Sequence, residues 1–264
     1  MKILANIIIA WTALFGGAAL AGVVEDAVDR GALRVGMSSF APWAMRAKDG
    51  SIIGFEPDVA RRMAEDMGVE AEIIPTAWDG IIPALLAKKF DLIIGGMSVT
   101  PARNLQVNFS FPYGYNGYEL AANRERMGGA STPEAFNRKE VIFAMRRGTL
   151  PVDIVKRQMP NATILQFDDE AAALQELLNG RADAWVGAAP GPFNFAAENP
   201  DKIFLPFDAY LDADHAGIAM RKGDADALNF INNWIQLRTA DGWLQSRHDY
   251  WFKGREWKPL VGGE

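Results

Sequence analysis

Short apolar runs alternate with amphipathic stretches along most of the chain. Over residues 56–67 the apolar side chains recur at helical spacing, with Pro57 in the first turn and Gly68 directly after the last, which predicts a helix. A second helix is predicted over residues 78–88. Strands are predicted by three short apolar runs, at residues 33–36, 69–74 and 91–94. Strands that alternate with helices indicate parallel pairing in an α/β architecture.

The same alternation returns in the second half of the chain. Strands are predicted at residues 140–145, 163–167 and 182–186, and helices at residues 151–158 and 169–179. Two α/β units in series predict two lobes rather than one large sheet. Each lobe is expected to be a mainly parallel sheet flanked by helices.

Two extended segments, residues 118–122 and 216–220, are expected to cross between the lobes as a two-strand hinge. Helices predicted at residues 224–239 and 241–248 then return to the first lobe. Lobe 1 would comprise residues 22–118, completed by residues 219–264, and lobe 2 would comprise residues 119–218.

The first 21 residues have the pattern of a cleavable secretory signal peptide. Met1-Lys2 precedes an apolar stretch over residues 3–20, and Ala19-Leu20-Ala21 forms a small-residue cleavage site. The alternative is a membrane anchor, for which this stretch is at the short end. The signal peptide predicts that the mature chain is periplasmic.

Composition excludes several function classes. The chain has no cysteine, which excludes thiolate metal sites, cysteine nucleophiles, disulfides and a lipid-anchored lipoprotein. Its net charge of −6 argues against nucleic-acid binding, which favours basic surfaces. The two histidines, His215 and His248, are far apart in the sequence and support neither a metal centre nor a nucleophilic triad. We therefore expect no cofactor.

Residues 95–103 (GGMSVTPAR) are the most informative segment for binding. They follow a predicted strand, and Thr100-Pro101 is a suitable N-cap and N1 pair, so a helix should begin here with Arg103 in its first turn. An arginine is unfavourable beside the positive end of a helix, and a bound carboxylate would reconcile the two. An ordinary surface arginine on a capped helix fits the spacing equally well.

Five segments together resemble the polar-amino-acid group of bacterial extracellular solute-binding proteins, the periplasmic components of ABC transporters. They are residues 40–43 (FAPW), 54–58 (GFEPD), 88–93 (KKFDLI), 95–103 (GGMSVTPAR) and 107–113 (VNFSFPY). The similarity extends over essentially the whole mature chain, in the order and spacing of the family.

The resemblance implies a ligand site. In the family, the arginine that matches Arg103 binds the ligand α-carboxylate, the serine that matches Ser98 assists, and the carbonyl at the position of Gly96 often accepts the ammonium. Aromatic residues that match Phe40 and Trp78 enclose the ligand side chain. Both stand near the carboxyl ends of strands, where α/β sheets place ligands, although each could instead cover the core of its lobe.

A second segment joins a strand to a helix in lobe 2, at residues 146–151 (RRGTLP). It resembles the family's Gly-Thr-Thr segment, and Thr149 is therefore expected to help enclose the ligand carboxylate. Arg146 stands where a small or apolar residue is usual. It is either a second cation for another negative group of the ligand or a solvated charge at the rim of the cleft.

The sequence departs from the family at Ala188, where most relatives carry an acid that binds the ligand ammonium. Asp183 precedes a strand and is expected to be structural, and Met37-Ser38 stand where relatives that bind basic amino acids carry an aspartate. A buried ammonium needs a partner. Either the ligand has no ammonium, or another acid replaces the missing one, for which the candidates are Glu119, Asp212 and Asp214.

The expected mechanism is closure of the lobes around a small carboxylate, an amino acid or a relative, followed by delivery to the ABC permease in the inner membrane. We expect a monomer and not an enzyme. One alternative is an enzyme that resembles cyclohexadienyl dehydratase on the same fold, against which Ala188 argues because it cannot donate a proton. Another is a ligand-sensing protein for a membrane receptor.

Overall fold

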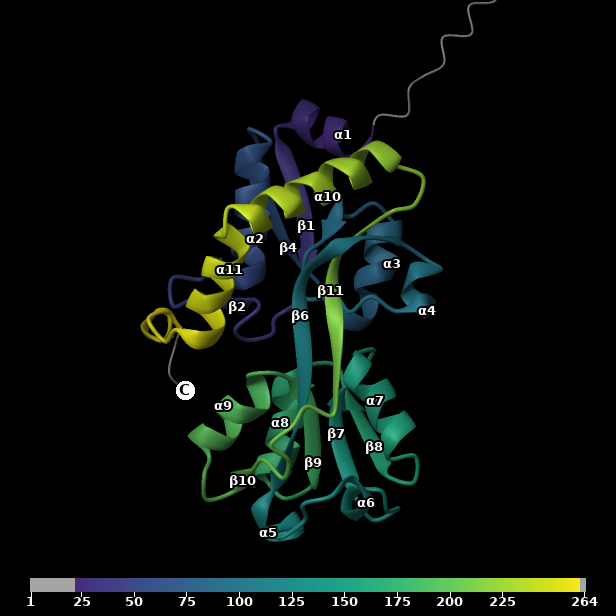
Figure 1. Cartoon of the computed structure of the whole chain (residues 1–264), viewed down its shortest axis with the longest axis vertical. Coiled ribbons are helices and arrows are strands. Elements are labelled where there is room, and N and C mark those ends of the chain that lie inside the picture. Colours follow the sequence, from purple (N-terminus) through teal and green to yellow (C-terminus); the bar gives the residue numbers. More distant parts are fainter. Residues whose placement is uncertain (1–21, 262–264) are drawn as a thin grey trace, which may run out of the picture.

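The computed structural model describes residues 22–261, so the expected signal peptide lies outside the described residues. These residues form two lobes joined by two long strands that run between them (Figure 1). None of the described helices is long and apolar enough to cross a membrane. The α/β, two-lobe fold predicted from the sequence is confirmed.

Lobe 1 is built on three short parallel strands. β1 (Ala32–Met37) lies between β4 (Glu70–Pro75) and β5 (Leu92–Ile93), and the two hinge strands extend the sheet from β5. Its helical segments in the first half of the chain are α1 (Val23–Arg30), α2 (Phe55–Asp66), η1 (Trp78–Gly80), α3 (Ile81–Leu86) and α4 (Pro101–Asn104). A short hairpin is formed by β2 (Met45–Arg46) and β3 (Ile52–Ile53).

The predicted helix over residues 78–88 is shorter than expected. It consists of a 3-10 turn followed by α3, which ends at Leu86. Lys88 has a φ of 60°, a left-handed conformation that does not continue a right-handed helix. The helix predicted to start at Pro101 is confirmed, because the hydroxyl of Thr100 accepts a hydrogen bond from the backbone N–H of Arg103 at 3.2 Å.

The hinge strands are longer than the sequence predicts. β6 (Asn108–Asn123) pairs with β11 (Asp212–Met220) in antiparallel register, from Asn108 opposite Met220 to Tyr118 opposite Asp212. The far end of β6 then pairs with β9 of lobe 2, so that one continuous sheet runs through both lobes (Figure 1). The lobe boundaries at residues 118/119 and 218/219 stay a prediction.

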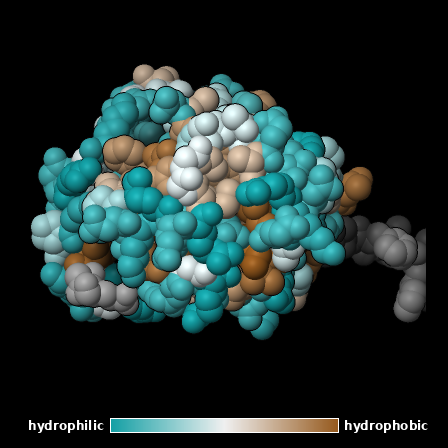
Figure 2. Space-filling model, turned by 90° about the horizontal axis from the view of Figure 1, so that it is seen from below, coloured by the Kyte–Doolittle hydropathy of each residue, from teal (hydrophilic) through white to brown (hydrophobic). Residues whose placement is uncertain are grey.

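Lobe 2 follows the predicted alternation of strand and helix. Its strands are β7 (Ile142–Arg146), β8 (Thr163–Phe167), β9 (Ala184–Ala188) and β10 (Ile203–Phe204), with β7 in parallel pairing to both β8 and β9. Its helices are α5 (Arg124–Met127), α6 (Pro133–Phe136), α7 (Leu150–Gln158), α8 (Glu170–Leu178) and α9 (Gly191–Glu198). The molecular surface seen from below is mostly hydrophilic, with apolar residues in small separate areas (Figure 2).

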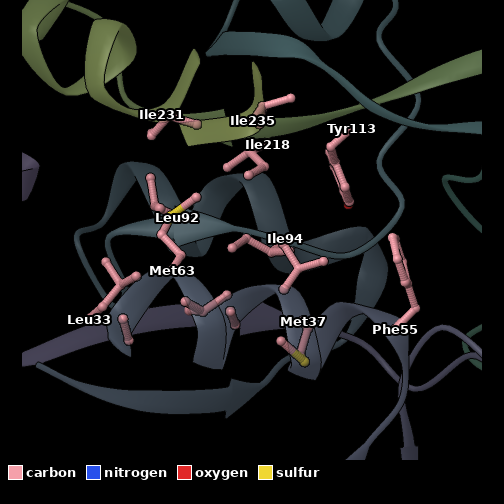
Figure 3. Close-up of a cluster of buried hydrophobic side chains, with 14 of the residues drawn as sticks. Leu33, Met37, Phe55, Met63, Leu92, Ile94, Tyr113, Ile218, Ile231 and Ile235 are labelled. Atoms are coloured by element: carbon pink, nitrogen blue, oxygen red, sulfur yellow. The ribbon is translucent and has the colours of Figure 1, made fainter. Parts of the chain in front are cut away.

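The C-terminal helices return to lobe 1, as the sequence predicts. α10 (Ala225–Ala240) buries Ile231 and Ile235 against the same core as Leu33 and Leu92 of the lobe 1 sheet (Figure 3). α11 (Trp243–His248) continues as a π-helical segment, η2 (Asp249–Lys253), and a 3-10 turn, η3 (Lys258–Leu260), ends the described chain. A separate buried cluster, which includes Phe136, Phe143 and Met145, forms the core of lobe 2.

In each lobe, one buried aspartate links neighbouring strands through hydrogen bonds. Asp91 accepts hydrogen bonds from the backbone N–H and the guanidinium of Arg34, at 2.9 and 2.8 Å. Asp183 accepts from the backbone N–H of Ile142 at 2.7 Å and from the guanidinium of Arg126 at 2.5 Å. Asp183 is therefore structural, because both its oxygens are committed to its own lobe.

Candidate functional site

A cavity of about 60 Å³ lies between the lobes, and residues of both lobes and of the hinge line it. Six of the seven residues predicted as ligand contacts line this cavity: Phe40, Trp78, Gly96, Ser98, Arg146 and Thr149. The other lining residues are Ser38, Trp43, Gly95, Asn116, Tyr118, Leu150, Pro151, Glu170, Trp185, Val186, Gly187 and Ala188. β1, β7 and β9 lead toward the cavity with their carboxyl ends, as expected for a ligand site in an α/β protein.

Aromatic rings form much of the wall. Phe40 stacks on Trp43, with ring centroids 6.3 Å apart and planes 5° from parallel. Trp43 is 2% exposed, and its indole N–H has no acceptor among the described residues. A Cβ at Gly96 would stand 3.2 Å from the Trp43 ring, and Gly96 has a φ of 63°. Glycine is therefore favoured at residue 96 by the left-handed backbone conformation, and a larger residue would also press on the Trp43 ring.

Arg103 lies beside the cavity rather than among its lining residues. Its guanidinium donates to the carbonyl of Ser98 at 2.9 Å and to the carbonyl of Gly148 in lobe 2 at 3.0 Å. Its guanidinium carbon lies 5.7 Å from the centroid of the Trp78 ring. Burial lowers the pKa of Arg103, while the charges of Tyr118 and Asp214 act in the opposite direction. The predicted contact between Arg103 and a ligand carboxylate stays a prediction.

The lobes are closed on one another by direct hydrogen bonds. The Gly148 carbonyl of lobe 2 accepts from the indole N–H of Trp78 at 3.0 Å as well as from Arg103. In the opposite direction, Arg146 of lobe 2 donates to the carbonyl of Ser39 at 3.2 Å and to the hydroxyl of Ser38. The cavity is thus enclosed by contacts that an opened form of the protein would lose.

Arg146 is a buried charge. It is 7% exposed, its Nε–H has no acceptor among the described residues, and its guanidinium carbon lies 5.7 Å from the centroid of the Trp78 ring. The alternative of a solvated charge at the rim is therefore wrong. Burial lowers the pKa of Arg146, and the nearby charges of Glu170, Asp169 and Asp79 act against that shift.

A model of the bacterial extracellular solute-binding proteins, family 3, matches residues 33–254. The chain belongs to this family.

Similar proteins and structures bind amino acids, with one enzyme among them. The L-cystine-binding protein TcyJ of Escherichia coli is 28% identical over 232 residues, which are 88% of this chain and 86% of that protein. Cyclohexadienyl dehydratase of Pseudomonas aeruginosa is 25% identical over 240 residues, covering 88% and 87% of the two chains. A putative ABC transporter binding component from Wolinella succinogenes, complexed with lysine, is 36% identical with a TM-score of 0.81, covering 87% of this chain and 99% of that one.

In this solute-binding protein, none of the three acids proposed to replace Ala188 lines the cavity. Asp212 forms an ion pair with Arg157, and Glu119 follows Tyr118 in β6, so that its side chain points to the opposite face of the sheet. Asp214 accepts from the amide of Asn116 at 2.8 Å and from the hydroxyl of Tyr118 at 3.2 Å. Asp214 therefore holds the lining residues Asn116 and Tyr118 in place without lining the cavity itself.

The acid that does line the cavity is Glu170, which sequence reasoning missed. It begins α8, whose N-cap Asp169 accepts a hydrogen bond from the backbone N–H of Ala172 at 2.7 Å. Glu170 is partly exposed. Burial raises the pKa of Glu170 to about 7, and the positive charge of Arg146 lowers it. The start of a capped helix directly after β8 was the sequence signal that could have indicated it.

A buried hydrogen-bond chain supports Gly96 from within lobe 1. The Gly96 N–H donates to the hydroxyl of Tyr113 at 3.0 Å, and this hydroxyl donates to the carboxyl of Glu56 at 2.7 Å. Burial raises the pKa of Glu56 to about 8, so that it is largely protonated at neutral pH. A similar chain of Ser98 and the Tyr118 hydroxyl, 3.0 Å apart, ends at Asp214.

His215, on β11, is exposed and packs its ring beside Tyr115, with centroids 4.9 Å apart. It does not line the cavity. His248, in α11, stacks on Phe252 with centroids 4.3 Å apart, away from the cavity lining. Both histidines therefore lie outside the site. No group of His, Cys, Asp and Glu side chains within residues 22–261 is arranged to hold a metal ion.

Proposed function

We propose that this solute-binding protein binds an amino acid in the cavity between its lobes and delivers it to the permease of an ABC transporter in the inner membrane. The observation that carries the proposal is the cavity itself, enclosed from both lobes and lined by aromatic rings and two opposite charges. The amino acids bound by similar proteins, cystine and lysine among them, support the same ligand class.

In this proposal the ligand joins the lobes. Phe40 and Trp78 cover its apolar part, and Ser98, Thr149 and the neighbouring Arg103 bind a carboxylate. Since these groups come from both lobes, they act together only in the closed form, so that the ligand stabilises closure. The closed form is then the one that the permease recognises.

A thermal-shift screen of the purified protein against the L-amino acids tests the proposal. A ligand at a hundredfold excess over its dissociation constant adds about 2.7 kcal/mol to the free energy of unfolding. We expect at least one amino acid to raise the melting temperature, and Arg103→Ala to reduce that rise. If no amino acid stabilises the protein, the proposed ligand class is wrong.

A second candidate function is catalysis of the cyclohexadienyl dehydratase type. The observation that favours it is the carboxyl of Glu170, which lines the cavity and has a pKa near neutrality, as a general acid requires. We nevertheless propose a binding role, because Ala188, where the resemblance places the catalytic acid, is apolar. Incubation with a cyclohexadienyl carboxylate, followed by the absorbance of an aromatic product, distinguishes the two. Turnover abolished by Glu170→Gln would establish the enzyme.

We also propose that the protein is exported to the periplasm and acts there as a monomer. N-terminal sequencing of the exported chain is expected to begin at Gly22. Size-exclusion chromatography coupled to light scattering is expected to give the mass of a single chain. An uncleaved, membrane-bound chain would contradict the first expectation, and a dimer mass the second.

A further inference from the structure

Two opposite charges line the cavity without being paired to each other. No ion pair or hydrogen bond joins Arg146 and Glu170 among the described residues, although Arg146 is the charged group that acts on Glu170. The carboxyl of Glu170 has no hydrogen-bond donor within residues 22–261. Arg146 has a buried Nε–H with no acceptor. Buried charges without full pairing are costly, so that this arrangement is expected to serve a ligand.

The topology of lobe 2 brings the two side chains together. Arg146 ends β7, and its strand partner at that point, Phe167, ends β8. After Phe167 the chain turns through two aspartates, and α8 begins at Glu170 and crosses back toward β7 and β9. Glu170 therefore lies on the side of Arg146 away from β6. Ala188, at the end of β9, lies on the other side, because β9 separates β7 from β6.

The charge pattern determines which ligand end fits here. A lone ammonium would be attracted to Glu170 but repelled by Arg146. A lone carboxylate would be attracted to Arg146 but repelled by Glu170. An amino-acid head group has an ammonium and a carboxylate bonded to the same carbon atom, so that it can pair with both residues at once. A lysine side chain or a simple dicarboxylate cannot.

We infer that Arg146 and Glu170 form a subsite for an amino-acid head group, with the ligand carboxylate at Arg146 and its ammonium at Glu170. The inference rests on the proposed function and deepens it. The group of Ser98, Thr149 and Arg103 binds one carboxylate in that proposal, and the Trp78 ring contacts the guanidinium groups of both Arg103 and Arg146. The resemblance assigns the carbonyl of Gly96, another lining residue, to an ammonium at that end, so that the proposed ligand is an amino acid with a head group at each end.

L-Cystine is the probe, because it has two head groups and two matched analogues. Cystamine keeps both ammonium groups and lacks the carboxylates, and 3,3′-dithiodipropionate keeps both carboxylates and lacks the ammonium groups. The chain has no cysteine, so that these disulfides cannot exchange with it. Isothermal titration calorimetry measures each dissociation constant for the parent and for the variants Arg146→Gln and Glu170→Gln.

We expect the parent to bind L-cystine at least about tenfold more tightly than either analogue, and more tightly than L-lysine or L-glutamate. Glu170→Gln should weaken the binding of L-cystine by roughly ten- to a hundredfold. It should not weaken 3,3′-dithiodipropionate, which has no ammonium and is repelled by the Glu170 carboxylate. Arg146→Gln should weaken L-cystine similarly, and more than it weakens cystamine, which has no carboxylate for Arg146 to bind. The control Glu119→Gln removes a partly buried acid outside the cavity lining, and should change none of the constants.

Folding is controlled in two ways. Melting temperatures are measured for each variant, and Arg146→Lys and Glu170→Asp serve as milder substitutions that keep the charge. The analogues also test the same pair in the unchanged protein. If Glu170→Gln weakens L-cystine and 3,3′-dithiodipropionate equally, the assignment of the ammonium is wrong. If an amino acid with one head group binds more tightly than L-cystine, the subsite is wrong while the proposed function stands. If no amino acid binds, the proposed function itself fails.

Discussion

The buried carboxyl of Glu56 makes the stability of lobe 1 depend on pH in a direction opposite to that of most acids. Its pKa is raised from 4.5 to about 8 by burial. Between these two values the unfolded chain has released the proton and the folded protein keeps it. The folded state therefore binds more protons, and the free energy of unfolding falls as the pH rises through this range.

The size of the effect follows from the shift. One pKa unit corresponds to about 1.4 kcal/mol, so that a shift of this size removes on the order of 4 kcal/mol between about pH 4.5 and about pH 8. Glu56→Gln keeps the shape and an acceptor for the Tyr113 hydroxyl but cannot ionise. We expect parent and variant to have similar stability near pH 5 and the variant to be more stable by several kcal/mol near pH 9.

Urea unfolding, followed by tryptophan fluorescence at about pH 5, 7 and 9, measures this difference. Glu134→Gln is the matched control, because Glu134 is exposed and its pKa is lowered rather than raised. The control should not gain stability relative to the parent as the pH rises. A difference between parent and Glu56→Gln that stays constant from pH 5 to 9 would refute the reasoning, since it would mean that Glu56 ionises normally in the folded protein.

Four further predictions concern the site and the lobe cores. Burial raises the pKa of Glu170 to about 7, and a ligand ammonium requires its ionised form. The affinity for L-cystine should therefore rise from about pH 6 to about pH 7, below the range in which the ligand ammonium groups lose their protons. Calorimetry of Glu170→Gln should show no such rise. Gly96→Ala should lower the free energy of unfolding by about 1 kcal/mol or more and weaken ligand binding. The reason is that residue 96 has a φ of 63° and an added Cβ would meet the Trp43 ring. Denaturant titration measures the first effect and calorimetry the second. Asp183→Asn should cost about 2 kcal/mol in the same titration, because two donors lose a charged acceptor. Trp78→Phe removes the hydrogen bond to the Gly148 carbonyl of lobe 2. Small-angle scattering of the ligand-free variant should therefore give a larger radius of gyration than the parent. An unchanged radius would show that this bond does not hold the lobes closed.

The unexpected length of the hinge strands has a non-local cause. β6 and β11 extend each other by pairing, and residues of the two strands that lie opposite each other are about a hundred positions apart in the chain. A local pattern of residues cannot report such a partner. The sequence therefore predicted only the last part of each strand, residues 118–122 of β6 and 216–220 of β11.

The position of Glu170 also depended on tertiary structure. Its local sequence indicates only the first turn of a capped helix. That this turn lies beside Arg146 follows from the order β9-β7-β8, which places the loop after β8 next to the end of β7. The acids that the sequence offered in place of Ala188 all lie on the hinge strands β6 and β11, whereas Glu170 follows β8.

The sequence by itself determined the features that arise from short-range chemistry. The alternation of apolar runs predicted the α/β lobes, Thr100-Pro101 predicted the start of α4, and the family motifs predicted six of the residues that line the cavity. The tertiary structure alone decided which acceptors the long side chains of Arg103 and Arg146 reach. Arg103 reaches a carbonyl of the opposite lobe and Arg146 reaches Ser38 and Ser39, because these acceptors come close only when the lobes close.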